Sequence, residues 1–245
     1  MFDHVTIRVS DRRASEAAYG TLLGTLGIES TYADEWFVEW DDFSLLDASA
    51  ERPVTSGLHI GFVAPSRSAV DAFWHAGRAN GLIDAGAPGE RPHYKPDYYG
   101  AFLLDPDGNS IEAVHHGSPR TGGGIDHLWL RTADLAASRR FYGVIAPSAG
   151  LHIRDLAPEH VQVVGSSGSF SVVPGPPTSG LHMAFPAATD AAVDEFHRAA
   201  TGAGYRDDGP PGERPAYHPG YYGAFVLDPD GNSVELVNHN RPANR

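Results

Sequence analysis

The sequence contains an internal duplication that covers nearly its whole length. Residues 81–116 and 204–239 align without a gap, and 25 of these 36 aligned positions are identical. The same offset of 123 residues relates Thr55–Phe62 to Thr178–Phe185. This period is far longer than the roughly 20–50 residues of solenoid repeats. The chain is therefore predicted to contain two copies of one domain and not a stack of small repeats.

A short segment rich in glycine, serine and proline joins the two copies. Residues 117–124 read GSPRTGGG and show no apolar periodicity, which is typical of a linker. We therefore predict a first domain over residues 1–117, a linker over 118–124 and a second domain over 125–245.

Composition excludes several classes of function. The 245 residues include 18 Lys and Arg, 31 Asp and Glu and no Cys, which gives a formal net charge of −13. Without Cys there is no disulfide, thiolate zinc site or Cys nucleophile. The negative charge argues against nucleic acid and anionic membranes as partners. No apolar run approaches about 18 residues, and Asp3 stands where a signal peptide carries positive charge. We expect a soluble cytoplasmic protein.

Apolar periodicity predicts the same order of elements in each copy. Each copy is expected to contain two βαβββ units, which makes the fold class α+β, with mixed or antiparallel sheets and helices on one outer face. In the first copy, helices are predicted over 12–26, ending at Gly27, and over 68–80, ending at Gly81. Strands are predicted over 3–9, within 31–40, and over 43–47, 58–63, 98–104 and 110–115, the last two flanking the turn DPDGN.

The duplication also selects polar residues that occur in both copies. Only three pairs of His and two pairs of Glu are related by 123 residues. These pairs are His4/His127, His59/His182, His116/His239, Glu90/Glu213 and Glu112/Glu235.

Three of these positions in each copy have the residue types of a metal site. Strand alternation directs His4, His59 and Glu112 away from their apolar neighbours. Two imidazoles and one carboxylate form the 2-His-1-carboxylate set, which leaves coordination positions open. The second copy repeats the set as His127, His182 and Glu235. The alternative is that each residue is a polar group on the solvent side of a half-buried sheet.

Arginine and tyrosine pairs provide further candidates. Arg8 and Arg131 share strand parity with His4 and His127, so each is either a hook for a substrate anion or a partner for a nearby acid. Tyr98-Tyr99 and the corresponding Tyr221-Tyr222 precede a strand, and one of each pair must face inward. We take Tyr99 and Tyr222 as candidate catalytic groups that donate a proton or orient bound oxygen. The alternative is an aromatic side chain that closes the core.

Two more shared features lie near the predicted sites. Glu90-Arg91-Pro92 and its copy Glu213-Arg214-Pro215 are expected in long loops, either covering a binding cup or fixed by a Glu–Arg ion pair. His116 and His239 have the parity of the Glu four residues earlier. They are either outer hydrogen-bond donors to the ligands or solvated strand ends.

The segments FDHVTIRVSD, SGLHIGF and YYGAFLLDPDGNSIEAV, with their second copies, resemble the vicinal oxygen chelate superfamily. That superfamily includes glyoxalase I, fosfomycin and bleomycin resistance proteins, methylmalonyl-CoA epimerase and extradiol dioxygenases. The resemblance implies paired βαβββ units that form a cupped sheet around a metal. By position, the ligands would be His4, His59 and Glu112, and His127, His182 and Glu235. Each set is drawn from one copy or shared between the two copies.

One departure from the superfamily pattern affects the expected reaction. Glyoxalase I and the epimerase usually supply a fourth ligand, Glu or Gln, from a strand that reads FSLL in one copy here and FSVV in the other. The resemblance therefore favours a dioxygenase-type oxidoreductase that uses Fe(II) or Mn(II) on a small-molecule substrate, with Zn or Ni as possible metals. One alternative is a lyase, isomerase or thiol transferase of the glyoxalase or fosfomycin type. Another is a metal-free drug-binding protein of the bleomycin-resistance type. The duplication fits a pseudo-dimeric monomer or a homodimer.

Overall fold

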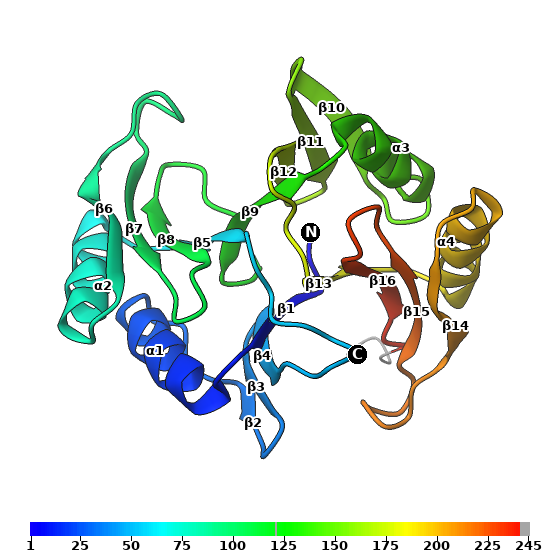
Figure 1. The fold of residues 1–245 in the computed structure, drawn as a ribbon, viewed down its shortest axis with the longest axis horizontal. Coiled ribbons are helices and arrows are strands. Elements are labelled where there is room, and N and C mark those ends of the chain that lie inside the picture. The colour runs from blue at the N-terminus through cyan, green and yellow to red at the C-terminus, as the bar shows by residue number, and fades with distance from the viewer. Residues whose placement is uncertain (121, 241–245) are drawn as a thin grey trace, which may run out of the picture. The chain divides into compact units, whose positions relative to one another are not determined.

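The computed structural model describes residues 1–120 and 122–240, which form two compact units (Figure 1). Thr121, in the predicted linker, and residues 241–245, at the end of the predicted second domain, lie outside the described residues. Unit 1 comprises Met1–Val5, Arg131–Pro177 and the chain from His182 on, and unit 2 comprises Thr6–Leu130 and Thr178–Leu181. Each unit therefore combines segments of both sequence copies. The boundary at 118–124, which concerns the sequence copies, stays a prediction.

Unit 2 contains two helices and most of the first nine strands. Its strands follow the hydrogen-bonded orders β1-β4-β3-β2 and β9-β5-β8-β7-β6. Strand β5 pairs in parallel with β8 and antiparallel with β9. The elements are β1 (His4–Val9), α1 (Arg12–Thr25), β2 (Tyr32–Ala33), β3 (Phe37–Trp40), β4 (Phe43–Asp47), β5 (His59–Val63), α2 (Arg67–Ala79), β6 (Ile83–Glu90), β7 (Tyr99–Leu104), β8 (Ser110–His115) and β9 (Ile125–Thr132).

Unit 1 repeats this arrangement with the remaining elements. It takes the beginning of β1 and the end of β9, in the orders β14-β15-β16-β13-β1 and β10-β11-β12-β9. Strand β13 pairs in parallel with β16. The elements are α3 (Leu135–Ile145), β10 (His152–Ala157), β11 (His160–Gly165), β12 (Gly168–Pro174), β13 (His182–Pro186), α4 (Asp190–Gly202), β14 (Asp207–Glu213), β15 (Tyr222–Leu227) and β16 (Ser233–Asn238).

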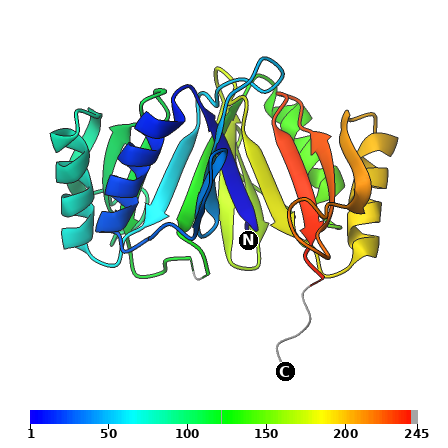
Figure 2. The ribbon, with the colours of Figure 1, turned by 90° about the horizontal axis from the view of Figure 1, so that it is seen from below.

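The α+β class is confirmed, with helices covering one face of the sheets in each unit. In Figure 2, α4 (orange) lies alongside β15 and β16 (red) of the same unit. Helix α1 begins after Asp11, whose side chain accepts the Ala14 N–H, and ends before Gly27 at φ 76°. Gly27 is the signal from which the sequence predicted the end of this helix, and Asp11 is its N-cap.

Strand β6 corrects the expectation that Glu90 lies in a long loop. Glu90 is the last residue of β6 and pairs with Tyr99 of β7. The sequence IDAGAPGE hides this strand because it is rich in glycine and lacks apolar alternation. The register shifts between Asp84 and Gly86 and between Gly86 and Gly89, so the strand bulges twice. Strand β14 has shifts at the corresponding positions.

Aromatic rings fill the core of both units in the same pattern. In unit 2, Phe43 contacts Tyr19 and Phe62 at centroid distances of 5.0 and 5.2 Å. In unit 1, Phe170 contacts Tyr142 and Phe185 at 5.1 and 6.1 Å. These side chains are at most 1% exposed and are among the largest that are fully buried in the core.

The shared DPDGN turn is tied to this core. Asp105 Oδ1 accepts the N–H groups of Asp107 and Asn109, and its Oδ2 accepts the hydroxyl of Tyr19 at 2.9 Å. Burial raises the pKa of Asp105 despite these hydrogen bonds. The motif therefore joins the β7–β8 hairpin to α1 and has a structural role.

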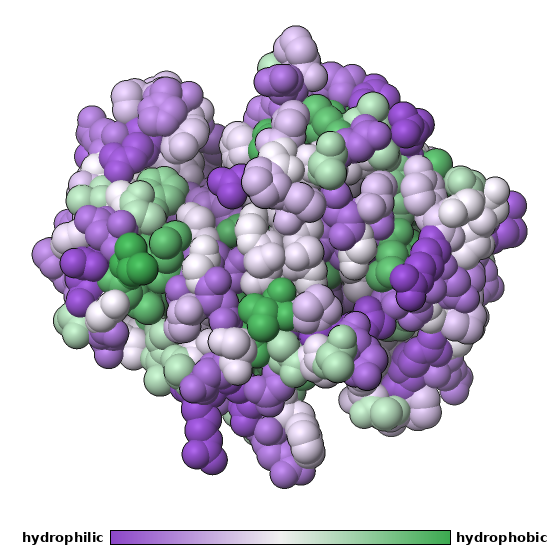
Figure 3. Space-filling view, viewed as in Figure 1, coloured by the Kyte–Doolittle hydropathy of each residue, from purple (hydrophilic) through white to green (hydrophobic). Residues whose placement is uncertain are grey.

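No helix among the described residues is long and apolar enough to cross a membrane. The face in Figure 3 is mostly hydrophilic, with scattered green apolar patches. The large apolar side chains that are exposed are Tyr32, Trp36, Ile83, Tyr94, Leu156 and Tyr217.

Gly77→Ala is expected to destabilise unit 2 by about 1 kcal/mol. A Cβ at Gly77 of α2 would overlap Cδ1 of Leu103 in β7 and lie 3.1 Å from Cδ2 of Leu22. Overpacking costs about 1–3 kcal/mol, and the higher helix propensity of Ala returns up to about 1 kcal/mol. The second copy has Ala200 and the smaller Val226 at the matching positions. Adding Leu103→Val should therefore restore the urea midpoint.

The matched control for this substitution is Gly24→Ala in α1 of the same unit. A Cβ at Gly24 meets nothing within 4 Å, so this change should raise the free energy of unfolding by about 1 kcal/mol. Equal shifts for both alanine variants would contradict the packing argument.

Candidate metal centres

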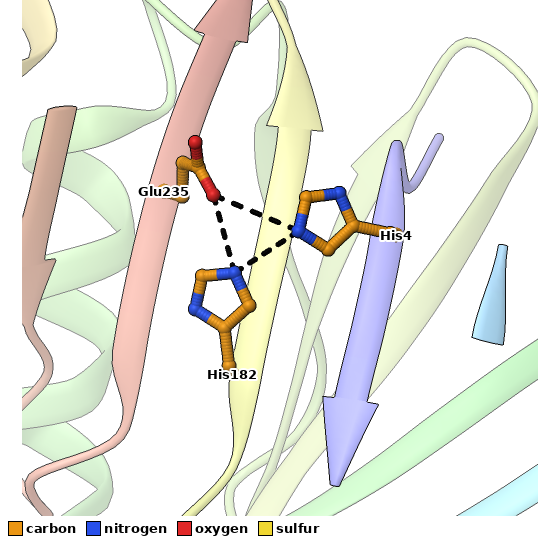
Figure 4. Close-up of side chains that lie close together, drawn as sticks. All are labelled: His4, His182 and Glu235. Atoms are coloured by element: carbon orange, nitrogen blue, oxygen red, sulfur yellow. Dashed lines mark hydrogen bonds and ion pairs between the residues drawn. The ribbon is translucent and has the colours of Figure 1, made fainter. Parts of the chain in front are cut away.

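Three ligand-type side chains converge in unit 1, and we call this group cluster 1 (Figure 4). His4 comes from β1, His182 from β13 and Glu235 from β16, three neighbouring strands of one sheet. The Nε2 atoms of the two His are 3.1 Å apart. Oε2 of Glu235 lies 3.6 Å from His4 Nε2 and 3.2 Å from His182 Nε2.

Unit 2 contains the same arrangement, which we call cluster 2. His59 comes from β5, Glu112 from β8 and His127 from β9. The two Nε2 atoms are 3.2 Å apart, and Oε2 of Glu112 lies 3.1 Å from His59 Nε2 and 3.4 Å from His127 Nε2. Each cluster thus takes one His from one sequence copy and the other His and the Glu from the other copy. Within each cluster, the ligands are shared between copies.

A carboxylate orients one His of each cluster from the opposite side of the ring. Asp3 Oδ1 lies 2.9 Å from His4 Nδ1, and Asp126 Oδ2 lies 2.9 Å from His127 Nδ1. Because a carboxylate only accepts hydrogen bonds, Nδ1 carries a hydrogen, and the neutral form of each ring presents its Nε2 lone pair to the cluster. In cluster 2, His59 Nδ1 also has a partner, Ser110 Oγ, at 2.9 Å.

A tyrosine holds the Glu of each cluster. The Tyr98 hydroxyl donates to Glu112 Oε1 at 2.7 Å, and the Tyr221 hydroxyl donates to Glu235 Oε1 at 2.6 Å. Each hydrogen bond leaves Oε2 facing the two imidazoles. Burial and the adjacent carboxylate raise the pKa of both tyrosines, so both phenols stay protonated and act as donors.

Glycines leave room for the ligand side chains. A Cβ at Gly100 would lie 2.5 Å from Glu112 Oε1, and one at Gly223 would lie 2.6 Å from Glu235 Oε1. In unit 2, a Cβ at Gly61 would lie 2.5 Å from His127 Cε1, whereas the matching residue of unit 1 is Ala184. The two clusters therefore differ in the space beside one His.

The electrostatics of cluster 2 show how strongly its groups interact. Burial opposes ionisation of Glu112, but the hydrogen bonds and charges of His127 and His59 lower its pKa to about 2. Burial likewise opposes charging of His127, but Asp126 and Glu112 raise its pKa to about 9. The pKa of Asp126 lies below its usual value because His116 and His127 outweigh burial. Glu112 is therefore a permanent anion that attracts either a proton or a metal to the facing imidazoles.

The donor set fits a divalent metal ion. Ligand atoms about 2.0–2.2 Å from one metal at angles of 90–110° lie about 2.9–3.6 Å apart. All six separations within the clusters, from 3.1 to 3.6 Å, fall in this range. Two imidazoles and a carboxylate suit Fe(II), Mn(II), Zn or Ni and leave positions for other ligands. Among the described residues, each cluster has three such groups and no fourth.

The structure does not bring the predicted Tyr99 and Tyr222 to the clusters. Their hydroxyls instead donate to Asp71 of α2 and Asp194 of α4, each at 2.8 Å. The inward partner of each Tyr pair is the first one, because Tyr98 and Tyr221 contact the ligand Glu. We therefore replace the candidates by Tyr98 and Tyr221.

Each candidate arginine belongs to a different unit from the His that lies on the same strand. Arg8 belongs to unit 2 and His4 to unit 1, whereas Arg131 belongs to unit 1 and His127 to unit 2. Arg8 Nη1 donates to the Asp47 carbonyl at 3.4 Å. The role of Arg8 and Arg131 as anion hooks stays a prediction.

The expected Glu–Arg ion pair has a different partner. Glu90 pairs with Arg67 at 2.9 Å, while Arg91 donates to the carbonyls of Ala87 and Glu90. Arg91 also lies over the ring of Phe102 at 5.6 Å.

Sequence reasoning missed Asp3 and Asp126, which orient the cluster His. His239 Nε2 lies 2.8 Å from Asp3 Oδ2, and His116 Nε2 lies 3.2 Å from Asp126 Oδ1. His116 and His239 therefore do not reach the ligands directly but act through these carboxylates. The signal was present, since the two Asp are related by 123 residues and each precedes a ligand His.

Comparison with known proteins finds similar folds. No protein-family model and no curated protein matches the sequence. Glyoxalase I from Zea mays is 18% identical with a TM-score of 0.68, over 97% of this chain and 92% of that chain. A candidate dioxygenase from Bacillus subtilis is 12% identical with a TM-score of 0.65, over 98% of this chain and 85% of that chain. A glyoxalase/bleomycin resistance protein from Albidiferax ferrireducens is 37% identical over 47% of this chain and 99% of that chain, with a TM-score of 0.44.

Proposed function

Because this chain has the fold of the vicinal oxygen chelate superfamily, we propose that it is a metal-dependent enzyme with two metal sites, clusters 1 and 2. The observation that carries the proposal is the repeated set of two Nε2 atoms and one Oε2 atom within 3.6 Å of one another. In each cluster at least one imidazole is oriented from behind by a carboxylate. A polar surface residue has no need of such support.

Within this class, we propose a dioxygenase-type oxidoreductase acting on a small substrate with vicinal oxygens. When bound, Fe(II) or Mn(II) would supply Lewis acidity for the substrate oxygens and redox chemistry with dioxygen. Tyr98 and Tyr221 would keep the ligand Glu in place by donating to Oε1. The absence of a fourth ligand among the described residues supports this choice over a glyoxalase reaction, which needs an additional acid–base carboxylate.

The test combines metal content with oxygen dependence. The chain would be purified anaerobically, and metal per chain would be measured by elemental mass spectrometry. We expect about two metal ions per chain and ring cleavage of a catechol panel only when O₂ is present. Turnover without O₂ would replace the dioxygenase by a lyase, isomerase or thiol transferase. Absence of metal even after soaking would overturn the enzyme proposal in favour of a drug-binding protein.

We also propose that the enzyme acts in the cytoplasm, as a pseudo-dimeric monomer or a homodimer. Sedimentation velocity distinguishes the two forms, because the monomer has a mass of 26.2 kDa.

Gly61→Ala is expected to weaken metal binding at cluster 2 by about 10–100-fold. The new Cβ would lie 2.5 Å from Cε1 and 2.8 Å from Nδ1 of His127. Asp126 and Glu112 hold this imidazole in place, so the ring can move only by losing those contacts. The estimate is the loss measured when support of a metal ligand is removed.

Titration with Mn(II), followed by electron paramagnetic resonance, measures the two affinities. The control is Ala184→Gly at the matching position of unit 1, which removes a methyl group and should leave cluster 1 unchanged. An unchanged cluster 2 in Gly61→Ala would show that the ring tolerates the methyl group.

A further inference from the structure

Two His outside the clusters form a hydrogen-bonded chain that ends at Asp3 in unit 1. His218 Nδ1 lies 2.8 Å from the Pro219 carbonyl, and His218 Nε2 lies 2.8 Å from His239 Nδ1. His239 Nε2 lies 2.8 Å from Asp3 Oδ2. The two imidazole rings are nearly parallel, at 13°. Asp3 in turn holds His4 of cluster 1.

The number of hydrogens in this chain determines its charge. The Pro219 carbonyl and the Asp3 carboxylate only accept hydrogen bonds, so the imidazole beside each of them must donate a ring N–H. The bond between the two rings needs a third hydrogen. Two neutral imidazoles together carry only two N–H groups. If all three hydrogen bonds are made, one of the two rings is an imidazolium.

The surroundings of the pair favour a positive charge. Asp3 is the charged group in direct contact, and its pKa lies below the usual value because His239 and His4 outweigh burial. The Tyr221 ring contacts both imidazole rings at centroid distances of 5.3 Å, and its hydroxyl donates to Glu235.

The first residue of α4 provides a further acid. Asp190 accepts hydrogen bonds from Asn238 and Asn240, which flank His239. Among the described residues, the charged groups that contact the pair or its neighbours in sequence are therefore acidic.

Unit 2 lacks this feature. His116 occupies the place of His239, but its Nδ1 accepts the Ser118 N–H at 3.2 Å, so one ring hydrogen, on Nε2 toward Asp126, is sufficient. The residue that matches His218 is Lys95, which donates to Ser118 Oγ at 3.5 Å. The His116 side chain is 2% exposed, whereas that of His239 is 23% exposed. A single buried imidazole thus replaces the pair.

We propose that His218 and His239 share an extra proton as a cationic imidazole pair, and that His218 is a positioning residue which makes the two clusters unequal. The cation offsets part of the negative charge of Asp3, which lies behind His4, whereas Asp126, which lies behind His127, faces only the single imidazole of His116. Cluster 1 should then bind a divalent metal more weakly than it would without His218. This last consequence rests on the proposed metal binding, whereas the charge of the pair does not.

The charge is tested on the whole metal-free chain, so failure of metal binding leaves the test intact. Nitrogen-15 NMR of histidine-labelled protein at pH 7.5 reports which ring nitrogens carry hydrogen. We expect three protonated nitrogens among the four of His218 and His239. In His218→Gln, His239 should keep a single hydrogen, on Nε2. One hydrogen on each ring in the unsubstituted chain would overturn the proposal.

The effect on cluster 1 is tested by Mn(II) titration at the same pH. Removing a unit charge from a partly exposed position should tighten binding at cluster 1 by about two- to tenfold in His218→Gln. Cluster 2 should not change. The matched control is His218→Lys, which introduces the residue of the matching position in unit 2 and keeps a unit positive charge, so it should leave the affinity of cluster 1 nearly unchanged. Structural damage would weaken cluster 1, so unchanged or weaker binding in a folded His218→Gln variant overturns the positioning role.

Discussion

Replacing His182 by alanine is expected to leave the chain with one bound divalent metal ion where the unsubstituted chain has two. The substitution leaves cluster 1 with His4 and Glu235. Two ligands hold a metal far less tightly than three, and we expect an affinity loss of more than about 100-fold, beyond the 10–100-fold that loss of a supporting group costs. His59→Ala should have the same effect on cluster 2, and the double variant should bind no metal.

Elemental mass spectrometry after equilibration with Mn(II) gives the stoichiometry. The His182 side chain is 16% exposed and lies outside the apolar core, so circular dichroism should show an intact fold. His75→Ala, on the exposed side of α2, controls for loss of any imidazole. Two metal ions retained in a folded double variant would show that the metal binds elsewhere.

The members of clusters 1 and 2 were predictable because the duplication marks them twice, whereas their role as metal ligands stays a prediction. Strand alternation put the six side chains on the correct side, and residue type suggested a metal. The grouping within each cluster was not predictable, since the sequence copies are identical at these positions. Pairing His4 with His182 instead of His59 depends on which strand ends hydrogen-bond, and no local pattern encodes that choice.

The wrong choice of tyrosine shows a second limit of prediction from strand alternation. Alternation indicates that Tyr98 and Tyr99 face opposite sides but not which side is inward. Tyr98 is inward because Gly100 leaves room for Glu112, which needs a donor for Oε1. The sequence also does not predict the proton count on His218 and His239. Their contact depends on how the loop between β14 and β15 packs against the end of β16.

Arg120, in the predicted linker at residues 118–124, forms a buried ion pair with Asp42 that the sequence did not suggest. Arg120 Nη1 lies 2.6 Å from Asp42 Oδ2, and the two side chains are 2% and 5% exposed. Asp42 Oδ1 also accepts the N–H groups of Gly124 and Ile125. A Cβ at Gly123 would overlap the same carboxylate. The glycine-rich composition therefore permits close backbone approach to Asp42.

Asp42→Ala is expected to lower the free energy of unfolding of unit 2 by about 3–5 kcal/mol. The substitution leaves the buried Arg120 guanidinium without its carboxylate and two backbone N–H groups without their acceptor. Arg120→Ala should cost a similar amount because it leaves the Asp42 carboxylate buried, where burial already raises its pKa. The double variant should lose less than the sum of the two, since neither charge is then left alone.

The control is Asp155→Ala, which removes an ion pair of the same chemistry at the surface of unit 1. Arg139 and Asp155 are 2.8 Å apart but 51% and 53% exposed, so the loss should be about 0–1 kcal/mol. Urea unfolding followed by circular dichroism compares the variants, because all four Trp lie in unit 2 and their fluorescence would not report on unit 1. Because the pair sits beside the first strand-forming residue of β9, its loss should also loosen His127 and weaken cluster 2 while cluster 1 keeps its metal. Equal destabilisation by Asp42→Ala and Asp155→Ala would mean that burial of the pair has no energetic consequence.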